Sequence, residues 1–143
     1  MSTSDPRFPA RFDPEAWATD RARSTPAGRI AAETARHDYE QNGIPQSHLR
    51  PCEPEGRTGI NLPDCAKVYV PHPNGRWGIV FRAILLDGRF ELRHLAFGVR
   101  HHPRGSHALD VYDIAGARLL EITARDLRAR GPGTPAPPAQ EEG

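Results

Sequence analysis

The sequence predicts an α+β fold, in which an N-terminal helical hairpin packs on a small antiparallel β-sheet and a further helix follows it. Helical periodicity with capping residues marks two segments before residue 44 and one after residue 110, and strand-like alternation marks three segments between residues 65 and 99. The order is helix, helix, strand, strand, strand, helix. In a chain of 143 residues this order fits one domain.

Two helical patterns lie close together near the N-terminus. Asp13-Pro14 supplies an N-cap and a proline at the first helical position, so a helix begins there and ends near Arg23. Ser24 or Thr25 caps a second helix, which runs to about Gln41 before Asn42-Gly43 ends it. Helices joined this closely are expected to form an antiparallel hairpin.

Three strands follow in the central part of the chain. Residues 65–70 alternate in polarity, with Lys67 and Tyr69 on one face, and residues 77–85 are apolar on nearly both faces, as in a central strand. Asp87-Gly88 predicts a tight hairpin turn. The returning strand changes its hydrophobic phase near Arg93-His94, which predicts a β-bulge there.

The remaining segments set the domain boundaries. We expect a flexible N-terminus over 1–9, one domain over 10–128, and a disordered tail rich in Pro and Gly over 129–143. The four prolines of residues 44–64 predict an irregular connection. The last helix presents one apolar face, made of Val111, Ala115, Leu119 and Ile122.

Composition excludes several classes of protein. The formal net charge is +1, which excludes a uniformly basic nucleic-acid coat and an acidic disordered chain. The longest apolar runs are too short to span a bilayer, and the N-terminus lacks a secretion signal, so we expect a soluble, cytoplasmic protein. Cys52 and Cys65 are expected to be free thiols in that compartment.

Positive charge is concentrated in residues 67–107. This segment holds seven Lys or Arg residues against two acidic ones, together with five of the seven histidines. A basic sheet face on a nearly neutral protein is typical of phosphate binding. The other interpretation, left open here, is a solvated face whose acidic partners come from the helices.

The densest basic stretch is the loop over residues 98–107. His101, His102 and His107 could supply imidazoles to zinc, but adjacent histidines point apart, neighbouring arginines repel a cation, and distant Cys52 and Cys65 would have to complete the site. Cleavage of RNA by its own 2′-OH instead needs a base, an acid and cations around the phosphate, which histidine and arginine can provide. A surface loop that is rich in Arg and His without a function is the third interpretation.

Several short motifs, in order, resemble the RelE/ParE toxin superfamily, particularly its messenger-RNA-cleaving branch. The likeness covers about residues 12–120, from the first helix, through the strands around Lys67, Arg82 and Arg100, to the final helix with Tyr112. Two positions depart from the pattern of the nuclease members, because Gly78 and Tyr69 stand where basic residues are usual.

The resemblance implies the toxin of a type II toxin–antitoxin system, an endoribonuclease that cleaves messenger RNA, free or on the ribosome, without metal or cofactor. It implies a cognate antitoxin that covers the basic face. The catalytic candidates are Lys67, Arg100, His101, His102 and Tyr112. The candidates for RNA binding are Tyr69, Arg76, Arg82, Arg104 and His107.

Two other functions stay open at this point. One is a ParE-like toxin that binds and inhibits a protein target such as DNA gyrase, in which the sheet is only a scaffold. The other is a domain that binds RNA or a protein partner without catalysis.

Overall fold

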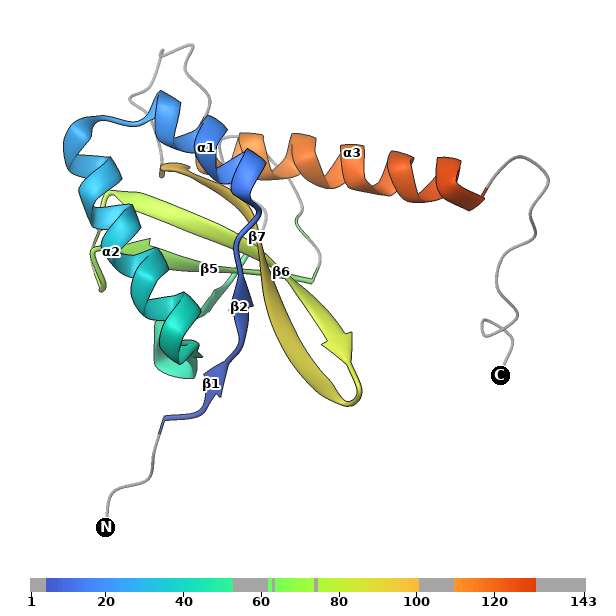
Figure 1. Cartoon of the computed structure of the whole chain (residues 1–143), viewed down its shortest axis with the longest axis horizontal. Helices are drawn as coiled ribbons and strands as arrows, with labels where there is room; N and C mark the ends of the chain where they lie inside the picture. Colours follow the sequence, from blue (N-terminus) through green and yellow to red (C-terminus); the bar gives the residue numbers. More distant parts are fainter. Residues whose placement is uncertain (1–4, 53–61, 63, 74, 101–109, 131–143) are drawn as a thin grey trace.

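A computed structural model describes residues 5–52, 62, 64–73, 75–100 and 110–130. Helices and strands together form an α+β fold, as the sequence predicts (Figure 1). None of the helices within the described ranges is both long and apolar enough to cross a membrane. In chain order the elements are β1 (Arg7–Phe8), β2 (Ala10–Arg11), α1 (Pro14–Arg23), α2 (Pro26–Asn42), β3 (Ile44–Pro45), the 3₁₀ turn η1 (Gln46–His48), β4 (Arg50–Pro51), β5 (Cys65–Val70), β6 (Trp77–Leu86), β7 (Arg89–Val99) and α3 (Val111–Arg130).

The main sheet has five strands in the order β2-β7-β6-β5-β4. The long strands β5, β6 and β7 are antiparallel, as expected, but the short β2 runs parallel to β7. The sheet is therefore mixed rather than purely antiparallel. The cause is local, because the N-terminal segment passes alongside β7 for two residues before α1 begins.

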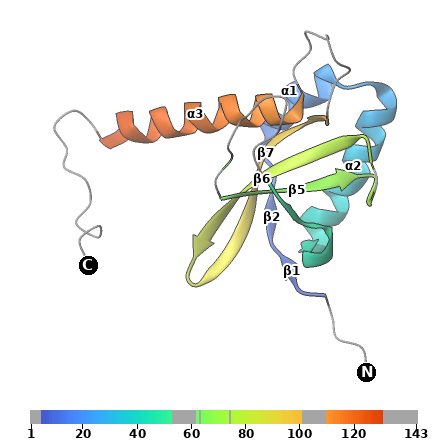
Figure 2. The same ribbon diagram turned by 180° about the vertical axis from the view of Figure 1, so that it is seen from behind.

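The two faces of the sheet carry separate apolar cores. Trp17 of α1 and Tyr39 of α2 pack with one face, on which Ile79, Phe81 and Phe97 are buried. The start of α3 packs against the opposite face through Val111, Tyr112, Ile114 and Ala115. Beyond these contacts α3 projects away from the sheet (Figures 1 and 2).

The predicted boundaries of α1 and α2 are confirmed to within about one residue. Asp13 precedes α1, and its carbonyl accepts the first helical hydrogen bond, from Trp17 N, at 2.9 Å. The Thr25 hydroxyl accepts a hydrogen bond from Gly28 N at 3.1 Å and caps α2. Gly43 ends α2 with a φ of +76°, which glycine adopts without strain.

α1 and α2 run in roughly opposite directions and contact each other (Figure 1), because Trp17 Nε1 donates a hydrogen bond to Glu33 at 3.0 Å and Arg21 Nε pairs with Glu33 at 2.9 Å. α1 lies across the end of the sheet and α2 descends beside it (Figures 1 and 2). The two linking residues, Ser24 and Thr25, are extended and turn the chain. Both helices bury apolar side chains in one core with the sheet, among them Trp17 of α1 and Ala32 and Tyr39 of α2.

The β6–β7 hairpin follows the prediction closely. Asp87 and Gly88 have φ values of +50° and +79°, as the turn that favours an Asp-Gly pair requires. Phe81 pairs with His94 and Val80 with Ala96, so Leu95 is the extra residue of a bulge. The bulge lies one residue beyond the predicted position and turns Leu95 and Ala96 toward the core beneath α3.

Three short segments differ from expectation. Arg7–Phe8, within the predicted flexible N-terminus, pairs with β3, and the predicted irregular connection contains β3 and β4. α3 continues to Arg130, two residues past the predicted end of the domain, and residues 131–143 lie outside the described ranges. Strands of two residues carry too little periodicity to be recognised in a sequence.

Candidate functional site

Lys67, Arg100 and Tyr112 come from three different elements and meet on the α3 side of the sheet. Lys67 lies on β5, Arg100 directly after β7, and Tyr112 in the first turn of α3. Lys67 Nζ is 4.8 Å from the centroid of the Tyr112 ring and 5.8 Å from that of Tyr69. We call Lys67, Tyr69, Arg100 and Tyr112, together with Arg50, the cationic-aromatic cluster.

Strand alternation explains how β5 contributes two members. Lys67 and Tyr69 share one face, whereas Val68 and Val70 point into the core beneath α1 and α2. Tyr69 is paired across the sheet with Gly78, which is paired in turn with Gly98. These two glycines leave room above the sheet for the side chains of the cluster.

Arg100 occupies the space above Gly78. A Cβ added at Gly78 would lie 3.1 Å from Arg100 Cγ and 3.4 Å from Val111 Cγ1. Arg100 thus fills the space that the missing side chain of Gly78 leaves above β6. Its Nη1 donates a hydrogen bond to the Gly75 carbonyl at 2.7 Å, and its guanidinium carbon lies 3.6 Å from the Tyr69 ring centroid.

Arg50 is a member of the cluster that sequence analysis missed. It lies on β4 opposite Lys67, and its guanidinium carbon is 5.0 Å from the Tyr69 ring centroid. Tyr69 therefore has two guanidinium groups next to its ring. The sequence gives no signal for Arg50, because β4 has only two residues and lies in a segment rich in proline.

The cluster has a buried layer and an accessible layer. Tyr112 is 1% exposed and Lys67 is 9% exposed, while Tyr69 and Arg100 are half-buried and Arg50 is exposed. Burial raises the pKa of Tyr112, although the nearby charges of Lys67 and Arg100 oppose the shift. Tyr112 is thus a neutral phenol at physiological pH and can act as a hydrogen-bond donor rather than as a base.

The other predicted site residues are less central. Arg76 is exposed in the turn before β6, where its carbonyl accepts a hydrogen bond from Arg100 N at 3.0 Å. Arg82 lies on β6 between Cys65 and Arg93, four residues along the strand from Gly78. The remaining four, His101, His102, Arg104 and His107, lie outside the described residues.

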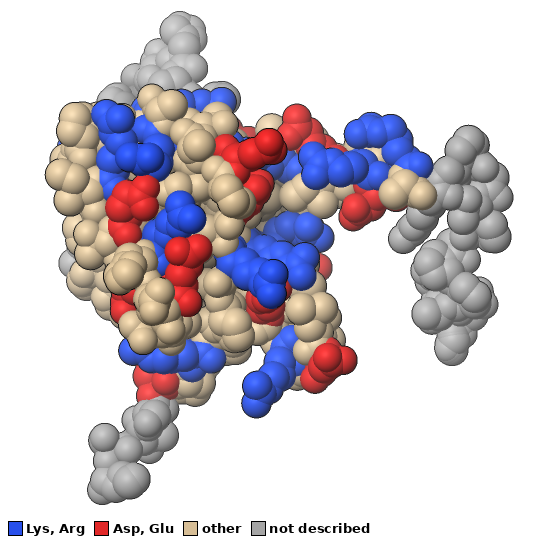
Figure 3. Space-filling model, viewed as in Figure 1, with Lys and Arg blue, Asp and Glu red and all other residues tan. Residues whose placement is uncertain are grey.

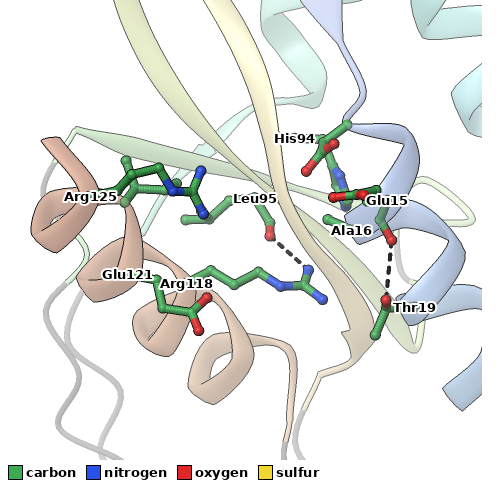
Figure 4. Close-up of a pocket in the computed structure, with 10 residues that line it drawn as sticks. Glu15, Ala16, Thr19, His94, Leu95, Arg118, Glu121 and Arg125 are labelled. Carbon is green, nitrogen blue, oxygen red and sulfur yellow. Dashed lines mark hydrogen bonds between the residues drawn. The ribbon is translucent and has the colours of Figure 1, made fainter. Parts of the chain in front are cut away.

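A separate hollow of about 270 Å³ lies between α1, β7 and α3 (Figure 4). Beneath it, the buried Asp20 accepts hydrogen bonds from Phe97 N at 2.8 Å and from both terminal nitrogens of Arg118, at 2.9 and 2.7 Å. Arg118 Nη1 also donates to the Leu95 carbonyl at 2.9 Å. Asp20 and Arg118 thus bond backbone groups of β7 at the edge that β2 does not cover. We therefore assign the network to the fold rather than to a ligand.

The electrostatics of Asp20 agree with a structural role. Burial alone would raise its pKa, but contacts with His94 and Arg118 and the Phe97 N–H lower the pKa below its usual value. His94 Nε2 of β7 lies 3.3 Å from Asp20 Oδ2 of α1. Elsewhere on the face drawn in Figure 3, basic and acidic side chains are interspersed, in keeping with a net charge of +1.

No protein-family model, no curated protein and no solved structure matches this chain. The resemblance to the RelE/ParE toxins therefore stays an expectation from short motifs.

Proposed function

We propose that this protein is a metal-independent endoribonuclease that cleaves messenger RNA by attack of the 2′-OH, as the toxin of a type II toxin–antitoxin system. The observation that supports this best is that two guanidinium groups, of Arg50 and Arg100, lie 5.0 and 3.6 Å from the centroid of the Tyr69 ring, with a third cation, Lys67, at 5.8 Å. Guanidinium groups suit phosphate oxygens, and an aromatic ring suits a nucleobase.

In the proposed reaction, the ribose 2′-oxygen bonds to the adjacent phosphorus while the bond to the 5′-oxygen of the next nucleotide breaks. A base takes the proton of the 2′-OH and an acid protonates the leaving 5′-oxygen, giving a 2′,3′-cyclic phosphate. Arg100 and Arg50 would stabilise the charge that develops on the phosphoryl oxygens. His101 and His102 are the sequence-based candidates for the two proton transfers.

The two buried residues, Lys67 and Tyr112, would affect RNA through the accessible residues of the cluster. Lys67 Nζ lies 5.8 Å from the Tyr69 ring centroid and 4.8 Å from that of Tyr112, where its charge adds positive potential with little access to water. We propose that Lys67 and Tyr112 position the accessible residues and that a cognate antitoxin covers the same face in the resting complex.

A second candidate is RNA binding without cleavage. It is favoured by the burial of Lys67 and Tyr112, because an ammonium group and a phenol that are at most 9% exposed have limited access to a substrate. This candidate predicts RNA affinity without any product.

The test is incubation of the purified protein with single-stranded RNA in the presence of a chelator. Cleavage products that end in a 2′,3′-cyclic phosphate would support the proposal, and intact RNA that is nevertheless bound would favour the second candidate. Induced expression in a bacterium separates the remaining alternative. Translation arrest fits an RNA-cleaving toxin, whereas DNA damage without translation arrest fits a gyrase inhibitor of the ParE kind.

A further inference from the structure

Two cysteines lie opposite each other where β4 meets β5. The register of this antiparallel pair places Pro51 opposite Ala66, so the next residue of the chain, Cys52, comes opposite Cys65. A backbone hydrogen bond from Cys52 N to the Cys65 carbonyl, at 3.4 Å, joins the two residues directly. The pairing of the two strands therefore continues one residue past the end of β4 and ends on the two cysteines.

Both cysteine side chains lie on the same face of the sheet. Cys52 and Cys65 both pack against the apolar core beneath α3. Strand alternation agrees with this, because Cys65 is two residues before Lys67 on β5, and Lys67 lies on that face next to Tyr112. Each cysteine is partly exposed, and no disulfide joins them in this structure.

This arrangement meets the geometric requirement of a disulfide. The Cα atoms of directly opposite residues in an antiparallel pair are about 5.5 Å apart where the pair is hydrogen-bonded and about 4.5 Å apart otherwise. Disulfides join residues whose Cα atoms are about 4.4–6.8 Å apart. The sulfurs of Cys52 and Cys65 can therefore be joined without a change in the pairing of the strands.

We propose that Cys52 and Cys65 form a site of reversible oxidation, at which hydrogen peroxide converts the two thiols into a disulfide that links β4 to β5. One thiol loses its proton and attacks the peroxide, which gives a sulfenic acid and one water. The second thiol attacks the sulfenic sulfur, and the S–S bond forms as the hydroxyl group leaves with the thiol proton as a second water. The peroxide takes up two electrons from the sulfurs, and a dithiol reverses the oxidation.

The environment of Cys65 slows this oxidation near neutral pH. Burial raises the pKa of the Cys65 thiol to about 11, an effect that Arg82 reduces and Asp64 increases. The thiolate is the nucleophile, and well below the pKa its fraction grows about tenfold for each unit of pH. The rate of disulfide formation should therefore rise between about pH 7 and about pH 9.

The disulfide would fix a strand that has few other attachments. β4 has two residues, and β5 is the strand with which it pairs among the described residues. β4 also carries Arg50, which lies opposite Lys67 in the cationic-aromatic cluster. Oxidation of the two cysteines therefore ties Arg50 more firmly to the cluster, and this chemistry does not require that the protein cleaves RNA.

Packing is the other role that two partly buried cysteines can have. Cysteine is a small apolar side chain, and both residues contribute to the edge of the core beneath α3. A packing role does not depend on the position of one thiol opposite the other, whereas disulfide formation does. Moving one thiol to the other face of the sheet therefore separates the two roles.

The matched variant is Cys65→Ser combined with Ala66→Cys. It keeps two thiols in the chain and changes their separation by one residue. Ala66 borders a groove of about 170 Å³ on the face away from α3, so this position has room for a sulfur atom. The second thiol then lies on the opposite face of the sheet from Cys52.

The experiment treats the reduced parent protein and the double variant with hydrogen peroxide in the presence of a chelator. The parent should lose about 2 Da and stay monomeric, peptide mapping should find Cys52 joined to Cys65, and dithiothreitol should restore both thiols. The double variant should form an internal disulfide at least about tenfold more slowly. Equal rates in the two proteins would overturn the inference. Sulfinic acids, covalent dimers or unreacted thiols in the parent would also overturn it.

Hydrogen exchange gives a second result that needs no variant. In the oxidised parent, the Cys52 amide, which donates to the Cys65 carbonyl, should exchange several-fold more slowly than in the reduced parent. The amides of Asp87 and Gly88, in the distant β6–β7 turn, should exchange at the same rate in both forms. An unchanged rate at Cys52 in the oxidised protein would contradict the attachment of β4 by the disulfide.

Discussion

The guanidinium carbon of Arg100 lies 3.6 Å from the centroid of the Tyr69 ring, and Nη1 of the same group donates to the Gly75 carbonyl at 2.7 Å. A planar cation stacked on an aromatic face and tied by a hydrogen bond has little freedom left. Arg100 is therefore held in place before any ligand arrives, which lowers the entropy cost of binding a phosphate.

Replacing Arg100 tests this arrangement. Arg100→Met should weaken RNA binding by roughly tenfold and slow cleavage by about 10²-fold, because the variant keeps the length of the side chain but loses the charge that faces the phosphate. Arg100→Lys should restore only part of the affinity, because an ammonium group cannot stack on the ring or form two parallel hydrogen bonds to a phosphate as a guanidinium does.

The matched control for Arg100 is Arg89→Met. Arg89 is exposed beside the β6–β7 turn, at the opposite end of the hairpin from Gly78. Fluorescence anisotropy with a labelled RNA measures both variants. The same loss of affinity in Arg89→Met would mean that only overall charge matters and that Arg100 has no special place.

Gly78 and Gly98 offer a finer test of the space above the sheet. The two are paired across β6 and β7, but a Cβ at Gly78 meets Arg100 Cγ at 3.1 Å, whereas one at Gly98 finds its nearest neighbour, Val111 Cβ, at 3.6 Å. Gly78→Ala should displace Arg100 by a few tenths of an ångström and reduce RNA affinity several-fold. Gly98→Ala should bind RNA as the parent does, and a larger loss in Gly98→Ala would contradict this account.

The buried Asp20 should dominate the stability of the junction between α1, β7 and α3. Asp20→Ala removes the acceptor of three hydrogen bonds and leaves Arg118 without its ion-pair partner, so it should lower the free energy of unfolding by about 3–5 kcal/mol. Urea unfolding measures the change. Asp126→Ala, at an exposed position of α3, should change it by less than about 0.5 kcal/mol; similar losses at the two positions would refute a structural role for Asp20.

His48 should make stability depend on pH. Burial lowers its pKa, and the neighbouring charge of His72 lowers it further. An unfolded histidine titrates near pH 6.5, so below about that pH the unfolded state binds more protons and the folded state loses stability as the pH falls. To a smaller extent, the charges of Asp5 and Asp38 raise the pKa of His48 and that of Arg7 lowers it.

His48→Gln isolates this contribution. Glutamine keeps an acceptor for the Tyr39 hydroxyl, whose pKa is raised to about 12 chiefly by burial, but it does not titrate. Urea unfolding at pH 7.5 and pH 5.5 should show a smaller loss of stability for His48→Gln than for the parent. His37→Gln, on an exposed face of α2, should behave as the parent does. Equal losses in parent and His48→Gln would exclude His48 as the cause.

Much of the secondary structure follows from interactions between residues that are neighbours in the sequence. The helix starts after Asp13 and Thr25, the end of α2 at Gly43 and the Asp87-Gly88 turn depend on neighbouring residues, so the sequence predicts them well, although the Asp13 side chain makes no capping hydrogen bond. The placement of α1 and α2 on the sheet could not be read in this way, because it depends on where the sheet offers apolar surface to each helix.

In the candidate site too, the features set by neighbouring residues could be predicted, and the contacts between distant segments could not. Alternation on β5 places Lys67 and Tyr69 on one face, and this much follows from sequence. The approach of Arg50 depends on a strand of two residues, and the stacking of His48 on His72 depends on two loops meeting. Both are tertiary contacts between irregular segments, for which a single sequence carries no periodic signal.

The most direct test of the central claim uses one RNA strand in two forms. After the preferred cleavage position is mapped, the strand is made again with a single 2′-deoxy nucleotide on the 5′ side of that position. We expect the parent protein to cut the all-ribose strand in the presence of a chelator and to leave the substituted bond intact while still binding the strand. Cleavage of both strands at the same bond and rate would contradict attack by the 2′-OH.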